Sequence, residues 1–267
     1  MKKSIFAALA VVLSLLMFAM PSSAQSDGAR VHLIHGIPGV DVDVYVDGAA
    51  VFEGFSFSDT QDLSSFAGQT LTAVQVKAAG ADDVLIDAGD LAVPASGNYT
   101  VFAHLDADGN PAIAVFENDV STIEAGNGRL VVRHAAAAPA VDVKANGEVA
   151  FSNLANGAEA SADLPAGTIS AEVVPTGADE PVVIGPADLP ITEGASLIVY
   201  ATGSLDDGLE VITESITDLG PTPTAVNTGD SPVDQGLPIG LALAAVAGAV
   251  ALLGGGSVAR RLLAKQA

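Results

Sequence analysis

The 267-residue chain contains no cysteine and no tryptophan, and aromatic residues make up only 4% of it. The lack of cysteine excludes a disulfide framework, a thiolate metal site, a cysteine nucleophile and a lipid-modified N-terminal cysteine. The 28 glycines and 14 prolines indicate many short elements joined by turns rather than long helices. With 49% apolar residues, the chain still has enough material for one or two buried cores.

Basic residues are also scarce, and their distribution is uneven. All 32 acidic residues lie between Asp27 and Asp234, a stretch with only five basic residues and therefore a net charge of −27. The other five basic residues lie at the two ends of the chain. So acidic a body is repelled by nucleic acid and by anionic lipid surfaces. No nucleic-acid partner is therefore expected.

The N-terminal 24 residues have the pattern of a secretory signal peptide. Lys2 and Lys3 precede an apolar run over residues 5–20, and small residues follow at 22–24. This order of a basic, an apolar and a small-residue region predicts cleavage after Ala24. The alternative is an N-terminal membrane anchor, which the shortness of the apolar run disfavours.

The C-terminal end has the pattern of a membrane anchor. Residues 237–259 carry no charge and would form a helix about 35 Å long, enough to cross a bilayer core. The basic tail, residues 260–267, predicts a cytoplasmic C-terminus and an exported body. Residues 220–236, rich in Pro, Thr, Asp and Gly, are expected to form an extended linker. The sequence thus predicts a single-pass surface protein.

An apolar tail with a terminal basic cluster also resembles a cell-wall sorting signal, which a sortase would process. Residues 225–229 keep the Thr-Gly of that motif but lack Leu-Pro, whereas residues 237–240 keep Leu-Pro but lack Thr. Plain membrane anchoring is favoured, and covalent attachment to the cell wall stays an alternative.

The body of the chain resembles itself at a shift of 99 residues. The shift superimposes the following pairs without a gap: Arg30 and Arg129, His35 and His134, Asp43 and Asp142, Gly48 and Gly147, Phe52 and Phe151. Several coincidences in one register over a domain length indicate duplication. The sequence therefore predicts two tandem repeats, residues 28–122 and 127–219, each of ordinary domain size.

Within each unit the pattern is that of β-strands. In residues 41–47 valines alternate with polar residues, so the valines share one face of a strand. Asp47-Gly48 and Asn146-Gly147 supply tight hairpin turns. Further strands are predicted at residues 71–77, 84–93, 99–104, 113–116, 169–174, 182–184, 197–200 and 209–213. Short strands at this spacing predict an all-β fold with one Greek-key β-sandwich per unit.

Residues 31–48, VHLIHGIPGVDVDVYVDG, resemble the opening of a secreted bacterial repeat, domain of unknown function 4397. Residues 134–142 with Gly147 resemble a weaker copy, in which Ala137 replaces the expected proline and only Pro139 remains. The resemblance covers about residues 28–218. It implies Ig-like β-sandwiches on an exported protein, often beside a C-terminal anchor, and it implies no activity or site.

Histidines matched between the units are the first chemical candidates. His35 and His134 each stand eight residues before an aspartate, Asp43 or Asp142. Such a pair suits a metal ligand or acid/base chemistry. The favoured interpretation is a histidine at a strand end that binds a backbone or Asp oxygen and fixes the local shape. Two further histidines lack counterparts in the second unit and are expected to be ordinary strand residues: His32 and His104.

One loop has the composition of a weak calcium site. Asp106, Asp108 and Asn110 offer oxygen ligands at the close spacing that calcium loops use. However, the acidic residue that would close such a loop is missing, and turn chemistry explains the same residues. A hairpin turn is favoured, calcium stays a hypothesis, and no other cofactor is expected.

The favoured function is a non-catalytic cell-surface module for adhesion, envelope structure or ligand capture, with an unknown envelope partner. Hydrolase motifs such as Gly-x-Ser-x-Gly or His-Glu-x-x-His do not occur. The contact surface is expected on two matched loops: Gly36, Ile37, Pro38 and Gly39 in the first unit, and Ala136, Ala137 and Pro139 in the second. Alternatives are a sortase-processed, pilin-like protein and a secreted metal-dependent hydrolase that uses His35, Asp43 or His104.

Overall fold

The computed structural model describes residues 28–221. The predicted signal peptide (1–24), the linker beyond residue 221, the predicted span (237–259) and the basic tail (260–267) lie outside the described residues. Within residues 28–221 no helix is long and apolar enough to cross a membrane. The described chain is all-β apart from one short 3-10 helix, η1, over Ser64–Phe66.

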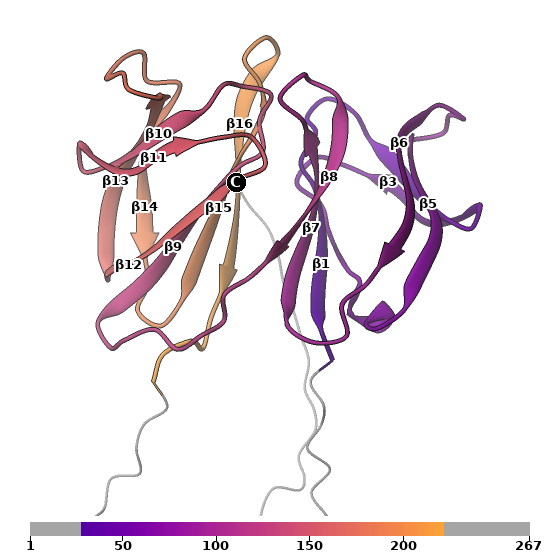
Figure 1. The fold of residues 1–267 in the computed structure, drawn as a ribbon, viewed down its shortest axis with the longest axis horizontal. Helices are drawn as coiled ribbons and strands as arrows, with labels where there is room; N and C mark the ends of the chain where they lie inside the picture. Colours follow the sequence, from indigo (N-terminus) through magenta and orange to yellow (C-terminus); the bar gives the residue numbers. More distant parts are fainter. Residues whose placement is uncertain (1–27, 222–267) are drawn as a thin grey trace, which may run out of the picture. The chain divides into compact units, whose positions relative to one another are not determined.

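The first half of the described chain forms two four-stranded sheets (Figure 1). One sheet has the order β4-β1-β7-β8, and the other has the order β3-β2-β5-β6. Their strands are β1 (Arg30–His35), β2 (Val42–Val46), β3 (Ala49–Phe55), β4 (Thr60–Asp62), β5 (Thr70–Ala78), β6 (Val84–Ala92), β7 (Asn98–Leu105) and β8 (Pro111–Glu117). We call this pair of sheets the first sandwich.

The second half repeats this arrangement with eight later strands. Its sheets have the orders β12-β9-β15-β16 and β11-β10-β13-β14, and we call them the second sandwich. In both sandwiches one pair is parallel, β1 with β7 and β9 with β15, and the other pairs are antiparallel. The strands are β9 (Asn127–His134), β10 (Val141–Ala145), β11 (Glu148–Leu154), β12 (Glu159–Pro165), β13 (Gly167–Pro175), β14 (Ile184–Ile191), β15 (Ser196–Ser204) and β16 (Gly208–Ile216).

Each sandwich buries its own apolar core between its two sheets. In the first, Val31 and Leu33 of β1 pack against Val42 and Val44 of β2. In the second, the corresponding strands β9 and β10 contribute Leu130, Val132, Val141 and Val143. These residues are two apart along their strands, so they share one face, as the alternation in the sequence predicts. The structure thus confirms an all-β fold with sandwich-like sheet pairs.

A third apolar cluster joins the two sandwiches, and we call this contact the seam. It consists of the residues on the other faces of the two central sheets: Ile34, Phe102, Phe116, Val131, Ala135, Ile198, Tyr200 and Ile212. The first three lie on β1, β7 and β8, and the others lie in the second sandwich. The central strands β1, β7, β9 and β15 are therefore buried on both faces.

The two predicted hairpin turns have the required backbone. Asp47 and Gly48 have φ of 50° and 76°, and Asn146 and Gly147 have φ of 53° and 84°. Positive φ at both central residues is the signature of the type I′ turn that joins strands with the natural twist. These turns link β2 to β3 and β10 to β11, which confirms both predictions.

One predicted strand is misplaced. Residues 182–184 were expected to form a strand, but β14 begins at Ile184 and runs to Ile191. Pro186 and Pro190 lie inside β14, and proline is usually a signal against a strand. Here β14 is the edge of its sheet, where a missing N–H costs no ladder bond. The edge position is a property of the tertiary arrangement, which explains the error.

Candidate functional site

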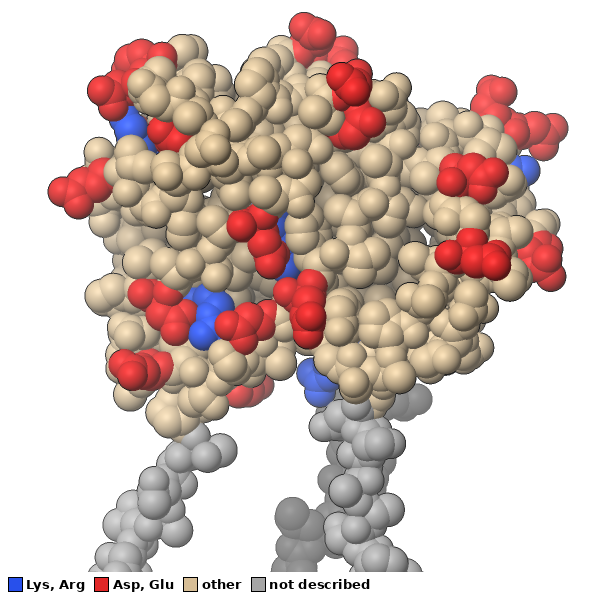
Figure 2. All heavy atoms as spheres, viewed as in Figure 1, with Lys and Arg blue, Asp and Glu red and all other residues tan. Residues whose placement is uncertain are grey.

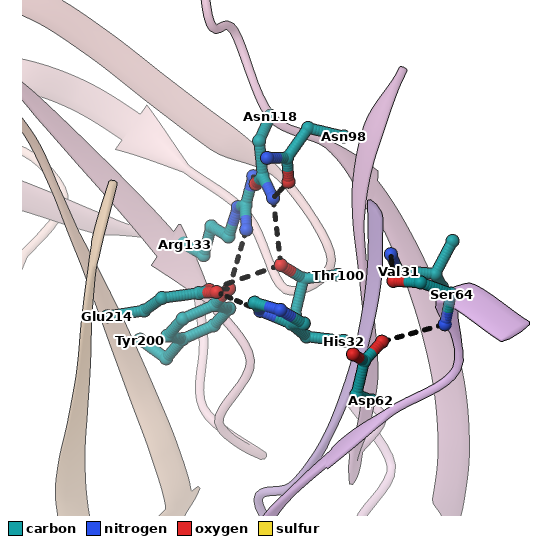
Figure 3. Close-up of polar contacts among 10 residues, drawn as sticks. All are labelled: Val31, His32, Asp62, Ser64, Asn98, Thr100, Asn118, Arg133, Tyr200 and Glu214. Carbon is teal, nitrogen blue, oxygen red and sulfur yellow. Dashed lines mark hydrogen bonds and ion pairs between the residues drawn. The ribbon is translucent and has the colours of Figure 1, made fainter. Parts of the chain in front are cut away.

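A polar network crosses the seam, and the Glu214 carboxylate lies at its centre (Figure 3). Glu214 Oε1 lies 3.0 Å from His32 Nδ1, while Oε2 accepts hydrogen bonds from Thr100 Oγ1 at 3.1 Å and from Tyr200 OH at 2.9 Å. His32 and Thr100 belong to the first sandwich, whereas Tyr200 and Glu214 belong to the second. One carboxylate therefore binds both sandwiches.

Arg133 of β9 supplies the cation of this network. Arg133 is only 1% exposed. Its guanidinium donates hydrogen bonds to Tyr200 OH at 2.6 Å, to Asn118 Oδ1 at 2.7 Å and to Glu159 Oε2 at 2.8 Å. The group also lies 4.4 Å from the centre of the Phe116 ring. A buried guanidinium is tolerated only with such a full set of partners.

The network fixes the charge state of its members. The hydrogen bond that His32 donates to Glu214 raises the pKa of His32 above 6.5, and this effect is larger than the lowering caused by burial. Burial alone would raise the pKa of Glu214, but the hydrogen bonds from His32, Tyr200 and Thr100, together with the charge of His32, outweigh it and hold that pKa below 4.5. Burial raises the pKa of Tyr200, so its phenol stays protonated and donates to Glu214. The His32–Glu214 contact is thus an ion pair in mildly acidic solution.

Replacement of His32 with glutamine is expected to destabilise the protein in a pH-dependent way. Because the folded-state pKa of His32 is raised, the pair contributes fully below about pH 6.5 and its contribution is lost as pH rises through the folded-state pKa. Because the pKa of Glu214 is lowered, its contribution is lost only as pH falls below 4.5. The difference in Tm between wild type and His32→Gln should be largest between pH 4.5 and 6.5.

Thermal unfolding of both proteins from pH 4.5 to pH 9 at constant ionic strength measures this difference. Thr100→Val is the matched control, because it removes another hydrogen bond to Glu214 from a group that does not titrate in this range. A His32→Gln difference that grows toward pH 9 would contradict the ion pair.

A groove of about 600 Å³ opens beside this pair. One wall comes from the first sandwich, at Gly28, at the start of β1 and at the start of β7. The other wall comes from residues 214–219 at the end of β16. Arg30, His32 and Asn98 lie on the first wall, and Glu214 and Asp218 lie on the second. The groove is therefore formed only because the two sandwiches are held side by side.

The matched histidines bind backbone oxygens. His35 Nε2 donates to the carbonyl oxygen of Val40 at 2.8 Å, and His134 Nε2 donates to that of Pro139 at 3.0 Å. In the second sandwich the other nitrogen, Nδ1, accepts from the backbone N–H of Ala136 at 3.3 Å. Burial lowers the pKa of both histidines, which keeps them neutral with the proton on Nε2. Each ring closes the loop that follows its strand, in line with the favoured interpretation.

The matched aspartates bind backbone N–H groups. Asp43 accepts from Gly54 N at 2.8 Å and from Gly80 N at 3.0 Å, one on each carboxylate oxygen. These two N–H groups lower the pKa of Asp43. Asp142 makes the equivalent pair of bonds, to Asn153 N at 2.7 Å and Gly177 N at 2.9 Å. Each carboxylate thus holds the end of the neighbouring strand, β3 or β11, and a turn against the start of its own strand, and the polar face of β2 is not simply solvated.

The predicted calcium residues form the turn between β7 and β8. Asp106 Oδ1 accepts from the backbone N–H groups of Asp108, at 2.9 Å, and Asn110, at 2.8 Å. These bonds lower the pKa of Asp106 and fix the conformation of the turn. Within residues 28–221 no three His, Cys, Asp or Glu side chains are placed to hold a metal ion. The calcium hypothesis therefore gains no support from the geometry.

The predicted contact loops are partly inside the molecule, which corrects the expectation for three of their residues. Gly36, Ile37 and Ala136 are buried. The carbonyl oxygen of Gly36 accepts a hydrogen bond from Thr202 Oγ1, and that of Ala136 accepts one from an Asn156 amide at 2.7 Å. Gly36 thus takes part in the seam, whereas Ile37 packs in the core of the first sandwich and Ala136 is bound within the second. The remaining loop residues are half-buried or exposed: Pro38 and Ala137 are half-buried, Gly39 and Pro139 are exposed.

The seam network itself was missed from the sequence. His32 was expected to be an ordinary strand residue, and neither Arg133 nor Glu214 was singled out. His104 is also buried, with Nδ1 2.9 Å from the carbonyl oxygen of Leu105. A usable signal for Arg133 is its place at the end of the apolar run 130–132 in a strand, where an arginine must be buried with partners.

A comparison with known families agrees with the resemblance of the first half. Residues 29–144 match the family described as "Domain of unknown function (DUF4397)". No curated protein matches the chain. The matched segment begins just before β1, includes the whole first sandwich and ends in β10 of the second. The match, which covers less than half of the chain, supports a DUF4397 domain over residues 29–144.

Proposed function

We propose that the chain is a non-catalytic cell-surface module, exported and anchored at its C-terminus, that serves adhesion, envelope structure or ligand capture. The observation that carries this proposal is that the candidate catalytic or metal-binding side chains form hydrogen bonds within the fold. His35, Asp43 and their counterparts are bonded to backbone groups, and His32 and Glu214 are bonded to each other across the seam. These contacts favour a rigid scaffold over a hydrolase.

We further propose that the two sandwiches are tandem Ig-like, Greek-key copies of one domain. Their sheets have the same strand order, and equivalent contacts recur at a spacing of 99 residues. The bond from His35 to Val40 corresponds to that from His134 to Pro139. A duplicated domain joined by a shared core is a rigid spacer, because relative motion would expose that core.

Strand direction supports the proposed orientation. The chain enters β1 and leaves β16 at the same end of the described structure (Figure 1). Strands β1 and β9 run away from that end toward the loops that contain Gly39 and Pro139. A C-terminal anchor would therefore place these exposed loop tips on the side away from the membrane.

Surface charge agrees with an exported, soluble body. Acidic side chains are spread over the viewed face, and basic ones are few (Figure 2). Three of the five basic side chains of the body, Arg129, Arg133 and Lys144, form ion pairs with carboxylates. The surface thus keeps a strong excess of negative charge, which favours solubility and disfavours a nucleic-acid or anionic-lipid partner.

Protease treatment of intact cells tests the proposal. Cells that express the full chain should lose the folded body to added protease, while a cytoplasmic marker survives. A variant that ends after residue 236 should appear in the medium at the size left by cleavage after Ala24. Protection of the body in intact cells would refute export and anchoring.

Electrophoresis of the same envelope fractions separates plain anchoring from the sortase alternative. A single band at the monomer size is expected. A ladder of SDS-resistant bands of high mass would favour covalent linkage to the wall or a pilin-like polymer instead.

A further inference from the structure

The groove beside the His32–Glu214 pair, which we call the seam groove, has the dimensions of a ligand site. Its volume of about 600 Å³ lies within the range of about 300–1,000 Å³ that small-molecule pockets occupy. Its two walls come from different sandwiches, and the seam network holds them in place. The site is therefore preformed, which reduces the entropic cost of binding.

One wall carries an available cation, Arg30. Among residues 28–221, the other four basic side chains have partners: Arg129, Arg133 and Lys144 in ion pairs, and Lys77 over the ring of Tyr45. Arg30 is exposed and makes no ion pair within this described part of the chain. A guanidinium in this position suits a carboxylate, which it binds through two parallel hydrogen bonds.

The opposite wall carries an available anion, Asp218. Asp218 is exposed, and its carboxylate accepts one hydrogen bond, from Thr217 Oγ1 at 3.1 Å. Glu214, in contrast, is held by three donors in the seam. The groove thus presents one free charge of each sign on facing walls. A simple anion is repelled by the acidic body, whereas a ligand with both charges satisfies Arg30 and Asp218 together.

Apolar side chains also line the groove. Val120 is 46% exposed and lines the groove together with the half-buried Ile216, whereas Leu219, also in the lining, is 8% exposed. Such surface favours a ligand that covers it with an aliphatic side chain, at a gain of about 25 cal/mol for each Å² removed from water.

We infer that the seam groove binds a zwitterionic ligand with an aliphatic side chain, a free α-amino acid or a short peptide, with its carboxylate on Arg30 and its ammonium group toward Asp218. The inference goes beyond the proposed function, because the groove would bind this ligand wherever the chain is located. Failure of the export test would therefore not contradict the inferred ligand site.

Nuclear magnetic resonance of the purified full chain tests the inference, with L-leucine as the probe. His32 lies in the groove wall, so its ring Cε1–H signal should shift in a saturable way, while the signals of His35 and His134 stay constant. Leucinamide lacks the carboxylate, 4-methylpentanoate lacks the ammonium group and glycine lacks the side chain. Each should bind at least about tenfold more weakly than leucine, the loss expected for about 1.4 kcal/mol.

Two variants with the same change in net charge locate the binding. Arg30→Gln should weaken leucine binding about tenfold or more, whereas Lys77→Gln, which removes a charge outside the groove, should leave it unchanged. Asp218→Asn should weaken leucine binding but not that of 4-methylpentanoate. No saturable shift with leucine at about 50 mM, well above a Kd of about 1 mM, would overturn the inference, and so would equal binding by wild type and Arg30→Gln.

Discussion

Replacement of Arg133 with alanine is expected to lower the free energy of unfolding by about 3–5 kcal/mol, the cost of breaking a buried ionic network by removal of one partner. The guanidinium is 1% exposed and donates to Tyr200, Asn118 and Glu159. Its loss leaves Asn118 Oδ1 without its charged donor in the buried seam, and it leaves a cavity beside the Phe116 ring. Urea unfolding followed by circular dichroism measures the change.

Arg129 provides a matched control for this prediction. It lies four residues earlier on the same strand, and it also binds carboxylates, Asp119 at 2.9 Å and Asp163 at 2.8 Å. Water can solvate those carboxylates after Arg129 is removed, whereas the loss of Arg133 also leaves the buried oxygens of Tyr200 and Asn118 without their donor. Arg129→Ala should therefore cost less than half as much as Arg133→Ala. Equal losses in the two variants would show that the seam network has no special energetic role.

The local structure was largely predictable because short-range rules determine it. Asp47-Gly48 and Asn146-Gly147 form the expected turns, since the backbone conformation of a two-residue hairpin admits few residue types. The interpretation of His35 as a strand-end histidine that binds a backbone oxygen agrees with the structure for a similar reason. A histidine at a strand end has the carbonyl group of the following loop within reach. In both cases the partners are at most a few residues apart.

The seam was not predictable from the same rules, because alternation with period two shows only that the faces of a strand differ. In β1 the residues Val31 and Leu33 face the core of the first sandwich, whereas His32 and Ile34 face the seam. The sequence pattern is the same whether the second face meets water or another sheet. His32 and Glu214 are 182 residues apart, so no spacing argument brings them together. A run without alternation, such as residues 130–132, is the one local sign of a strand buried on both faces.

Replacement of Phe102 with alanine is expected to cost about 3–5 kcal/mol, as is usual for removal of a fully buried aromatic ring. Phe102 of β7 is 0% exposed, and its ring stacks on that of Tyr200 with the centroids 4.3 Å apart and the planes 3° from parallel. The ring also fills the space above Gly36, where a Cβ atom would lie 2.3 Å from it. Because sheets lie on both sides of the Phe102 ring, the structure can collapse only partly into the space that the ring leaves. Most of the cavity should therefore persist.

The more informative result is which part of the protein loses stability. If the seam makes the two sandwiches one cooperative unit, the loss in Phe102→Ala should lower hydrogen-exchange protection equally in β7 and in β15, in a single unfolding transition. Phe57→Ala is the control, because Phe57 packs only partly against the same cluster and should cost about 1 kcal/mol. Separate transitions, with only the first sandwich destabilised, would mean that the sandwiches fold independently. Because the groove at Arg30 needs both walls, such a result would also make that groove a transient feature rather than a preformed one.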